Sequence, residues 1–209
     1  PERDESMKLF GVPPTRALRP IWLINEMGLD CEIVDVDFGS DEVMRLNPAG
    51  KLPVLVDGDV TVTESIAIQL YLAEKFPAHG FIPDDLAARA EMHRWNFFLA
   101  TEIEQPLWRI ALNTSIYEEN RRVAADIPNA EADAKRMLAV FEAHMTGRDF
   151  VAGNRLSVAD FNAAYTLDWA LNAKLLDGFP RLMAYRAELY ARPAAPETIG
   201  EGLKRLGLA

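Results

Sequence analysis

A proline at the head of a predicted strand is the feature that most constrains the fold of this chain. Pro53 follows Leu52 and precedes the apolar residues 54–56. Proline cannot donate a hydrogen bond to a sheet and is normally excluded from central strands. We therefore expect a special backbone geometry at this point, with a cis peptide bond between Leu52 and Pro53. The main-chain groups of Leu52 would then be free to pair with a molecule other than the protein.

The next predicted element begins with an acid and a hydroxyl, Glu64 and Ser65, where a helix is expected to start. The free N–H groups and the dipole of a helix N-terminus favour a bound carboxylate. Together with Leu52, these two residues predict a site for a short peptide-like ligand.

The order of predicted elements indicates two domains. Residues 8–12 and 32–38 favour strands around a helix at 17–27 that ends on Gly28, a natural C-cap. Two further strands flank Asp57-Gly58, a dipeptide typical of a tight antiparallel hairpin, and a helix is expected at 65–76. Beyond the run at 77–83, which is typical of a linker, only helical periodicity remains. We therefore predict an α/β domain over residues 7–78, a linker over 79–86 and an all-helical domain over 87–209.

Composition excludes several functions. The net charge of -10 opposes binding to nucleic acid and to anionic lipid. No apolar run is long enough to cross a membrane and no secretory signal opens the chain, so we expect a cytoplasmic protein. Residues 1–6 are expected to be a frayed tail or an expression remnant.

The single cysteine, Cys31, rules out an internal disulfide and any Cys-x-x-Cys motif. We expect Cys31 to be a small buried residue at a strand start, and we expect no metal.

Ser157 and Asp160 have the spacing of a capping box at a helix start, and Leu156 and Phe161 occupy the positions of a hydrophobic staple. Asp160 is therefore predicted to be structural and not catalytic.

Thr15 and Arg16 fall in the loop between the first strand and the first helix. This loop lies at the carboxyl end of the strand, where α/β sheets bind ligands. Thr15 is a candidate for chemistry there, although a threonine at this position is also suited to capping the helix.

Four segments, taken together, resemble the soluble glutathione transferases. Each segment alone is weak, but their order and spacing are specific. The resemblance extends over nearly the whole chain from Met7. The chain is similar to bacterial members of the family, but the motifs do not indicate a class. It implies a thioredoxin-like N-terminal domain, a helical C-terminal domain, a homodimer, a role in detoxification, and glutathione bound mainly by the first domain. The segments are MKLFGVPPTRALR from residue 7, LNPAGKLPVLV from residue 46, TESIAI from residue 63 and LSVADF from residue 156.

The resemblance also implies how glutathione is held. The backbone of Leu52, before Pro53, would pair with the cysteinyl part of the tripeptide. Glu64 would bind the ammonium group and Ser65 the carboxylate of the γ-glutamyl end, while Lys51 would reach the glycyl carboxylate. A solvated lysine and a plain helix start remain the simpler alternatives for these side chains.

At the catalytic position the family carries Tyr, Ser or Cys. Thr15 falls where serine-type enzymes carry their hydroxyl, and Arg16 where cysteine-type enzymes carry their thiol. We expect Thr15 to donate a hydrogen bond to the thiolate of glutathione, with Arg16 as an auxiliary charge. The electrophile is expected beside the sulfur, against Pro14 and against residues of the first long helix of the second domain. These residues are Phe98, Glu102 and Gln105, with packing in the core as the alternative for Phe98.

The expected reaction is the addition of glutathione thiolate to a small hydrophobic electrophile. A glutathione-dependent peroxidase, dehalogenase or isomerase on the same fold remains open. A non-catalytic module that binds glutathione or a protein partner also remains open. A thiol-disulfide oxidoreductase is excluded because the chain has no dithiol.

Overall fold

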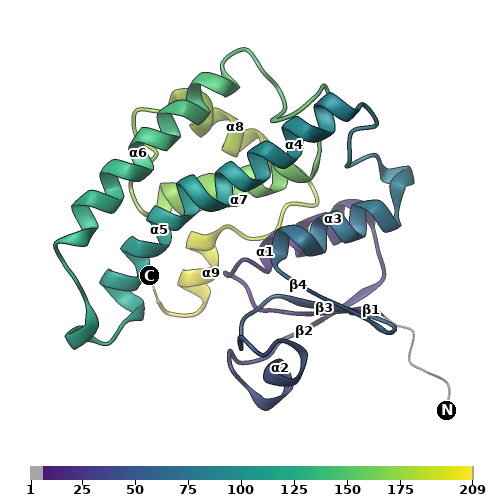
Figure 1. Cartoon of the computed structure of the whole chain (residues 1–209), viewed down its shortest axis with the longest axis horizontal. Helices are drawn as coiled ribbons and strands as arrows, with labels where there is room; N and C mark the ends of the chain where they lie inside the picture. The colour runs from purple at the N-terminus through teal and green to yellow at the C-terminus, as the bar shows by residue number, and fades with distance from the viewer. Residues whose placement is uncertain (1–6, 209) are drawn as a thin grey trace. The chain divides into compact units, whose positions relative to one another are not determined.

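The structure is a computed structural model that describes residues 7–208. The chain divides into two compact units (Figure 1). One comprises the residues up to Ile82 together with those from Tyr190 onward, and the other comprises Pro83–Leu189. The residues from Tyr190 onward thus group with the first unit, whereas the sequence analysis placed them in the helical domain.

The first unit is built on a four-stranded mixed sheet with the strand order β2-β1-β3-β4. β1 pairs in parallel with β2 and antiparallel with β3, and β3 pairs antiparallel with β4. Asp57 pairs with Val60 across the turn, and Gly58 has a left-handed φ of 58°, so the hairpin predicted at Asp57-Gly58 is confirmed. The strands are β1 (Met7–Phe10), β2 (Cys31–Val34), β3 (Val54–Asp57) and β4 (Val60–Thr63).

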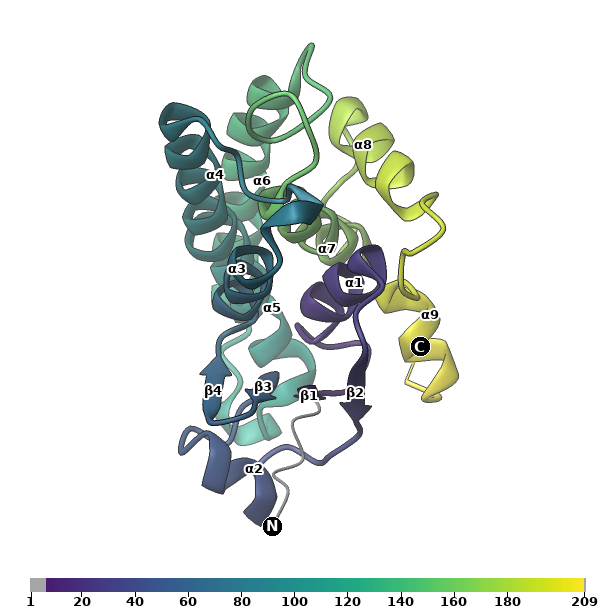
Figure 2. The same ribbon diagram turned by 90° about the vertical axis from the view of Figure 1, so that its right-hand side faces the viewer.

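Helices cover both faces of this sheet (Figure 2). α1 (Leu18–Met27) and α3 (Ser65–Lys75) pack against each other on one face. On the other face, Val43 of α2 (Asp41–Leu46) packs in a cluster with Phe10, Leu52 and Val54. This arrangement is thioredoxin-like, as the sequence predicted. α1 ends at Gly28, whose φ of 62° confirms the predicted C-cap.

The sequence analysis missed α2. Six residues are too few to show a helical period, and the segment is mostly exposed. A local signal is Ser40, whose side chain accepts a hydrogen bond from the Val43 N–H at 3.3 Å and so caps the helix.

The second unit is helical, and no strand occurs among its residues. A π-helical turn at Leu99–Ile103 interrupts the long first helical segment, and a second one at Leu112–Ile116 ends it. α7 lies at the core, since nearly all of its residues are buried. The α-helices are α4 (Leu86–Phe98), α5 (Glu104–Ala111), α6 (Asp126–Met145), α7 (Val158–Asn172) and α8 (Pro180–Tyr190).

The predicted capping box at the start of α7 is confirmed. Oδ2 of Asp160 accepts hydrogen bonds from the N–H (2.7 Å) and the hydroxyl (2.8 Å) of Ser157. Oδ1 accepts from the Val151 N–H at 2.8 Å and from the Tyr185 hydroxyl at 2.5 Å. Burial raises the pKa of Asp160, and these hydrogen bonds act in the opposite direction. Every oxygen of Asp160 is thus occupied by the protein, in agreement with its predicted structural role.

Two negative findings apply to the described part of the chain. None of its helices has both the length and the apolar character that crossing a membrane requires. Nowhere in residues 7–208 do three or more His, Cys, Asp or Glu side chains gather in a way that could hold a metal ion.

Candidate functional site

The register of the sheet gathers the predicted binding segments at one end of the first unit. Phe10, the last residue of β1, lies opposite Val54 at the start of β3, and Val54 lies opposite Thr63 at the end of β4. A Cβ placed on Gly11 would lie 3.5 Å from the Cβ of Pro53. The loop after β1, the turn before β3 and the start of α3 therefore meet at this end of the sheet.

The peptide bond between Leu52 and Pro53 is cis, as predicted. The Leu52 side chain is buried in the core cluster of the first unit. In the part of the chain that the structure describes, neither the N–H nor the carbonyl of Leu52 forms a hydrogen bond with protein. Within the described residues, no protein group therefore competes with a ligand for these two groups. A second cis bond, between Pro13 and Pro14, was not predicted.

Glu64 precedes α3 in an unusual backbone conformation. Its φ of 68° lies in the left-handed region, which is uncommon for a residue other than glycine. The Glu64 side chain is exposed and makes no capping hydrogen bond to the helix. The first N–H groups of α3 are consequently left without a side-chain cap, and such groups favour an anion.

Lys51 is exposed at the other side of the same turn. Its carbonyl accepts a hydrogen bond from Asn47 Nδ2 at 2.8 Å, which fixes the backbone ahead of Leu52. The structure records no ion pair of the Lys51 ammonium group with any residue in 7–208. The ammonium group is therefore placed in solvent, where it is accessible to a carboxylate.

A buried arginine that the sequence analysis did not single out lies behind Ser65. Arg19 of α1 is only 2% exposed, and its Nη1 donates a hydrogen bond to Ser65 Oγ at 3.0 Å. The sequence signal was a cation at the second position of a mainly apolar helix. The two residues are 46 positions apart, so the pairing itself is a product of the fold.

Thr15 lies in the loop between β1 and α1, and its hydroxyl is engaged within that loop. Thr15 Oγ1 donates a hydrogen bond to the Val12 carbonyl at 2.5 Å and accepts one from the Ala17 N–H at 3.2 Å. The hydroxyl thus closes the turn that leads into α1. Arg16, the next residue, is half-buried.

The C-terminal segment packs against this loop within the first unit. α9 (Ile199–Arg205) lies beside α1 in both views (Figures 1 and 2). Gly202 of α9 is buried, and a Cβ placed on it would lie 2.7 Å from the Cβ of Pro14. Only a glycine therefore allows the helix to approach Pro14 so closely.

The remaining predicted pocket residues belong to the second unit. Phe98, the last residue of α4, is half-buried, and its ring meets Trp95 edge-on at a centroid distance of 4.9 Å. Glu102, in the first π-helical turn, and Gln105, in α5, are exposed. Phe98 thus takes part in the aromatic packing that was its alternative interpretation, while the other two side chains reach solvent.

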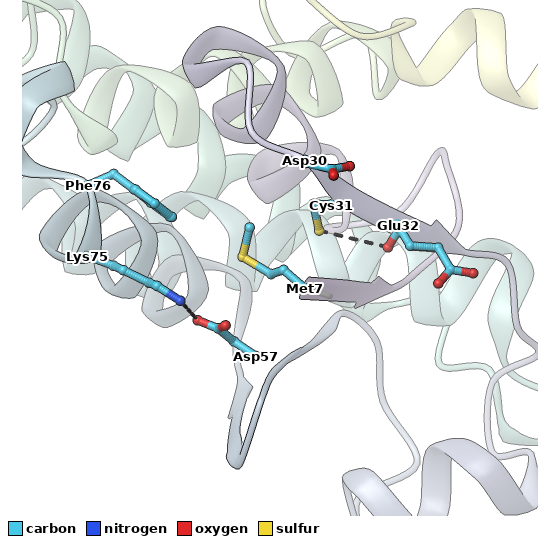
Figure 3. A pocket seen from close by; sticks show the side chains of 7 residues that line it. All are labelled: Met7, Asp30, Cys31, Glu32, Asp57, Lys75 and Phe76. Carbon is cyan, nitrogen blue, oxygen red and sulfur yellow. Dashed lines mark hydrogen bonds and ion pairs between the residues drawn. The ribbon is translucent and has the colours of Figure 1, made fainter. Parts of the chain in front are cut away.

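A separate pocket of about 390 Å³ lies at the opposite end of the sheet, where β1 and β2 begin (Figure 3). Cys31 lines it, and desolvation raises the pKa of the Cys31 thiol to about 11. Lys75 and Asp57 form an ion pair at its edge, and the Tyr71 hydroxyl donates to Asp57 at 2.6 Å. A thiol with this pKa stays protonated near neutral pH and is a poor nucleophile.

Comparison with known proteins shows the family of the chain. Residues 5–74 match the sequence model described as "Glutathione S-transferase, N-terminal domain", and residues 99–193 match "Glutathione S-transferase, C-terminal domain". Glutathione S-transferase 3 of Zea mays is 30% identical over 92% of this chain and 93% of its own length. The chain belongs to the glutathione S-transferase family.

Solved structures of glutathione S-transferases share its fold. The glutathione S-transferase from Xylella fastidiosa is 27% identical, with a TM-score of 0.82 over 97% of this chain and 100% of that one. Glutathione S-transferase-I bound with lactoylglutathione is 28% identical, with a TM-score of 0.77 over 91% of this chain and 96% of that one. The predicted membership of this family and the predicted fold are therefore confirmed.

Proposed function

We propose that this member of the family is a glutathione transferase that adds the glutathione thiolate to small hydrophobic electrophiles. The observation that carries the proposal is the main chain of Leu52, which is free of protein hydrogen bonds within residues 7–208 and lies beside an uncapped helix start. Glutathione offers a strand-like backbone for the first feature and a carboxylate for the second. Glutathione S-transferase-I, which has the same fold, was solved bound with lactoylglutathione.

Each end of the tripeptide has a partner in this proposal. Leu52, ahead of Pro53, pairs with the cysteinyl residue through its N–H and carbonyl. Ser65 and the first N–H groups of α3 bind the γ-glutamyl carboxylate, and Glu64 binds the ammonium group beside it. Lys51 binds the glycyl carboxylate.

Thr15 is proposed to stabilise the thiolate as a hydrogen-bond donor. A thiol starts near a pKa of ~8.5, and lowering the pKa by one unit requires about 1.4 kcal/mol of preference for the thiolate. A hydrogen bond to a charged group contributes roughly 1.5 to 3 kcal/mol, which corresponds to one or two units. One donor therefore suffices to populate the thiolate near neutral pH. Thr15 does not take the thiol proton, because a hydroxyl is too weak a base.

The Val12 carbonyl competes with the sulfur for the single hydrogen of Thr15 Oγ1. The hydrogen must turn from the carbonyl to the sulfur when glutathione binds. This exchange is favourable because an anionic acceptor forms a stronger hydrogen bond than a neutral carbonyl. Arg16 is the proposed auxiliary charge in the same loop.

Thr15→Val tests the donor role, because valine keeps the shape of threonine and removes the hydroxyl. The pKa of bound glutathione, followed by the ultraviolet absorbance of the thiolate, should rise by about one to two units, and kcat should fall about 10- to 100-fold. The dissociation constant for glutathione should change little. Thr15→Ser should retain both properties, and Thr61→Val, on an exposed strand position, is the matched control. An unchanged thiol pKa in Thr15→Val would exclude Thr15 as the donor.

Pro14, Phe98, Glu102 and Gln105 are the proposed contacts of the electrophile. Substituting Phe98 with Ala should change the relative turnover of an aryl halide and an isothiocyanate while leaving the affinity for glutathione unchanged. A homodimer, a cytoplasmic location and a role in detoxification complete the proposal.

A non-catalytic glutathione-binding module is the second candidate. The observation that favours it is the hydroxyl of Thr15, whose hydrogen is already donated to Val12. Calorimetry with glutathione combined with turnover of an aryl halide separates the two candidates. Binding without turnover of any electrophile would favour the module, and turnover that depends on Thr15 would favour the enzyme.

A further inference from the structure

The buried guanidinium of Arg19 makes a specific contact with the proposed glutathione site. Arg19 is 2% exposed and Ser65 4% exposed, and Arg19 Nη1 donates to Ser65 Oγ at 3.0 Å. Ser65 is the first residue of α3, so this contact ties α1 to the point where the helix begins.

A second hydrogen bond holds Arg19 from the same helix. Gln69, one turn beyond Ser65 and fully buried, donates its Nε2–H to the Arg19 carbonyl at 3.0 Å. α3 therefore holds Arg19 at two points: Ser65 contacts the Arg19 side chain, and Gln69 contacts the Arg19 backbone. The Gln69 contact holds the backbone of Arg19, and the Ser65 contact directs Nη1 of its guanidinium.

Hydrogen-bond chemistry decides the orientation of the Ser65 hydroxyl. A guanidinium can only donate, so Ser65 Oγ is the acceptor in this pair. The single hydrogen of the hydroxyl must then point away from Arg19. The structure assigns it no acceptor among residues 7–208, and it is left to donate to an acceptor outside the protein.

The charge of Arg19 acts in the same direction. A cation in a buried environment is screened far less than one in water, so it attracts a nearby anion more strongly. The uncapped N–H groups at the start of α3 favour an anion at the same place. The cation, the directed hydroxyl and the helix terminus all select a negatively charged oxygen.

We infer that Arg19 is a positioning residue for the γ-glutamyl carboxylate of glutathione, acting through the Ser65 hydroxyl. This inference rests on the proposed function. Arg19 does not contact the ligand itself. It fixes Ser65 as a donor and adds a buried positive charge behind it, so the site distinguishes tripeptides with the carboxylate from those without it.

A pair of ligands separates this role from mere packing. Glutathione is compared with γ-aminobutyryl-cysteinylglycine, which lacks only the carboxylate in question. Dissociation constants are measured by calorimetry for the wild type, Arg19→Met, Arg19→Lys and Ser65→Ala. Arg45→Met, which removes an exposed arginine from the same unit, is the control.

Arg19→Met and Ser65→Ala should each weaken glutathione binding by about tenfold or more, with little effect on the analogue. Arg19→Lys, which keeps a buried cation, should lose less affinity for glutathione than Arg19→Met does. The double variant should be no weaker than the more affected single variant, because both act on one interaction. In steady-state assays the loss should appear in KM for glutathione and not in kcat.

Equal losses for both ligands in Arg19→Met would overturn the inference, because a packing defect does not depend on the carboxylate. If Arg19→Met does not fold, the other two variants still test the inference. An equal loss of affinity for both ligands in Arg19→Lys would overturn it. Ser65→Ala with no loss of affinity for glutathione would also overturn it. A wild type that binds neither ligand would instead refute the proposed function.

Discussion

The two ends of the proposed glutathione site are built differently. At the start of α3, Ser65 is buried and held from behind by Arg19, and the hydrogen of its hydroxyl remains available. In the loop after β1, Thr15 is half-buried, and the hydrogen of its hydroxyl is donated to Val12. One end thus presents a donor that the fold has already directed, while the other presents a donor that must change partner.

The difference separates recognition from chemistry. A site whose polar groups are fixed before binding loses little entropy when the ligand arrives, so it supplies affinity. A donor that exchanges a neutral acceptor for an anionic one gives its benefit only when the thiolate forms, so it acts on reactivity. We therefore expect changes at the α3 end to alter affinity and changes around the loop to alter turnover.

The contact between α9 and the loop offers the largest test of this division. In Gly202→Ala the added methyl group would overlap Pro14, whose rigid ring cannot turn aside, so the loop or the helix must shift. We expect a loss of about 1 to 3 kcal/mol in the free energy of unfolding. Turnover should also fall while the dissociation constant for glutathione stays the same. Lys204→Ala, at an exposed position of α9, is the control. A loss of affinity as large as the loss of turnover would break the division.

The pH dependence of the C-terminal anchor is a smaller test. Both carboxylate oxygens of Glu26 accept hydrogen bonds from Arg192, at 2.6 Å and 2.8 Å, and these bonds hold the pKa of Glu26 below its usual 4.5. Because the pKa is lowered in the folded state, the stabilisation is present above about 4.5 and is lost as the pH falls through the lowered pKa.

Glu26→Gln should therefore lose about 1 kcal/mol of unfolding free energy near neutral pH, since Arg192 is partly exposed, and less in acid. Urea unfolding of both proteins at neutral and acidic pH measures the difference. Arg192 anchors the segment that carries α9. Glu26→Gln should therefore lower turnover more than it lowers the affinity for glutathione. A difference that grows as the pH falls would contradict the assigned sign.

Cys31 should give the smallest effect, because it lies at the other end of the sheet from the site. Cys31→Ala should leave the affinity for glutathione and the turnover unchanged. In the wild type, reaction of the thiol with a disulfide reagent should be slow near neutral pH and rise as the pH approaches about 11, since burial raises the pKa of Cys31 to that value. Rapid labelling near neutral pH would show that the environment of this thiol is more polar than the structure indicates.

Features that depend on a few neighbouring residues were predicted correctly from the sequence. The cis bond at Leu52-Pro53, the Gly28 cap and the Ser157–Asp160 box are all local, because their chemistry is complete within one turn or one hairpin. The helix at 41–46 was missed because it is short: six residues carry too little periodicity to predict a helix. The membership of the glutathione S-transferase family, suggested by four short motifs, was confirmed by comparison.

Several parts of the site depended on tertiary structure. The sequence named Thr15, Leu52, Glu64 and Ser65, and their proposed roles in binding and catalysis stay predictions. The sequence did not show that the Thr15 hydroxyl donates a hydrogen bond to the Val12 carbonyl, because this contact depends on the path of the loop.

By itself, the sequence determined the order of elements in the first unit apart from α2, the family and the residue types offered to a ligand, since periodicity, caps and turns act over a few residues. Only the tertiary structure decided which of these residues are held, and by what. Arg19 and Ser65 are 46 positions apart, and Pro14 meets Gly202 from the far end of the chain. Such pairings arise because packing brings distant segments within contact distance, where burial strengthens a hydrogen bond or forbids a single methyl group.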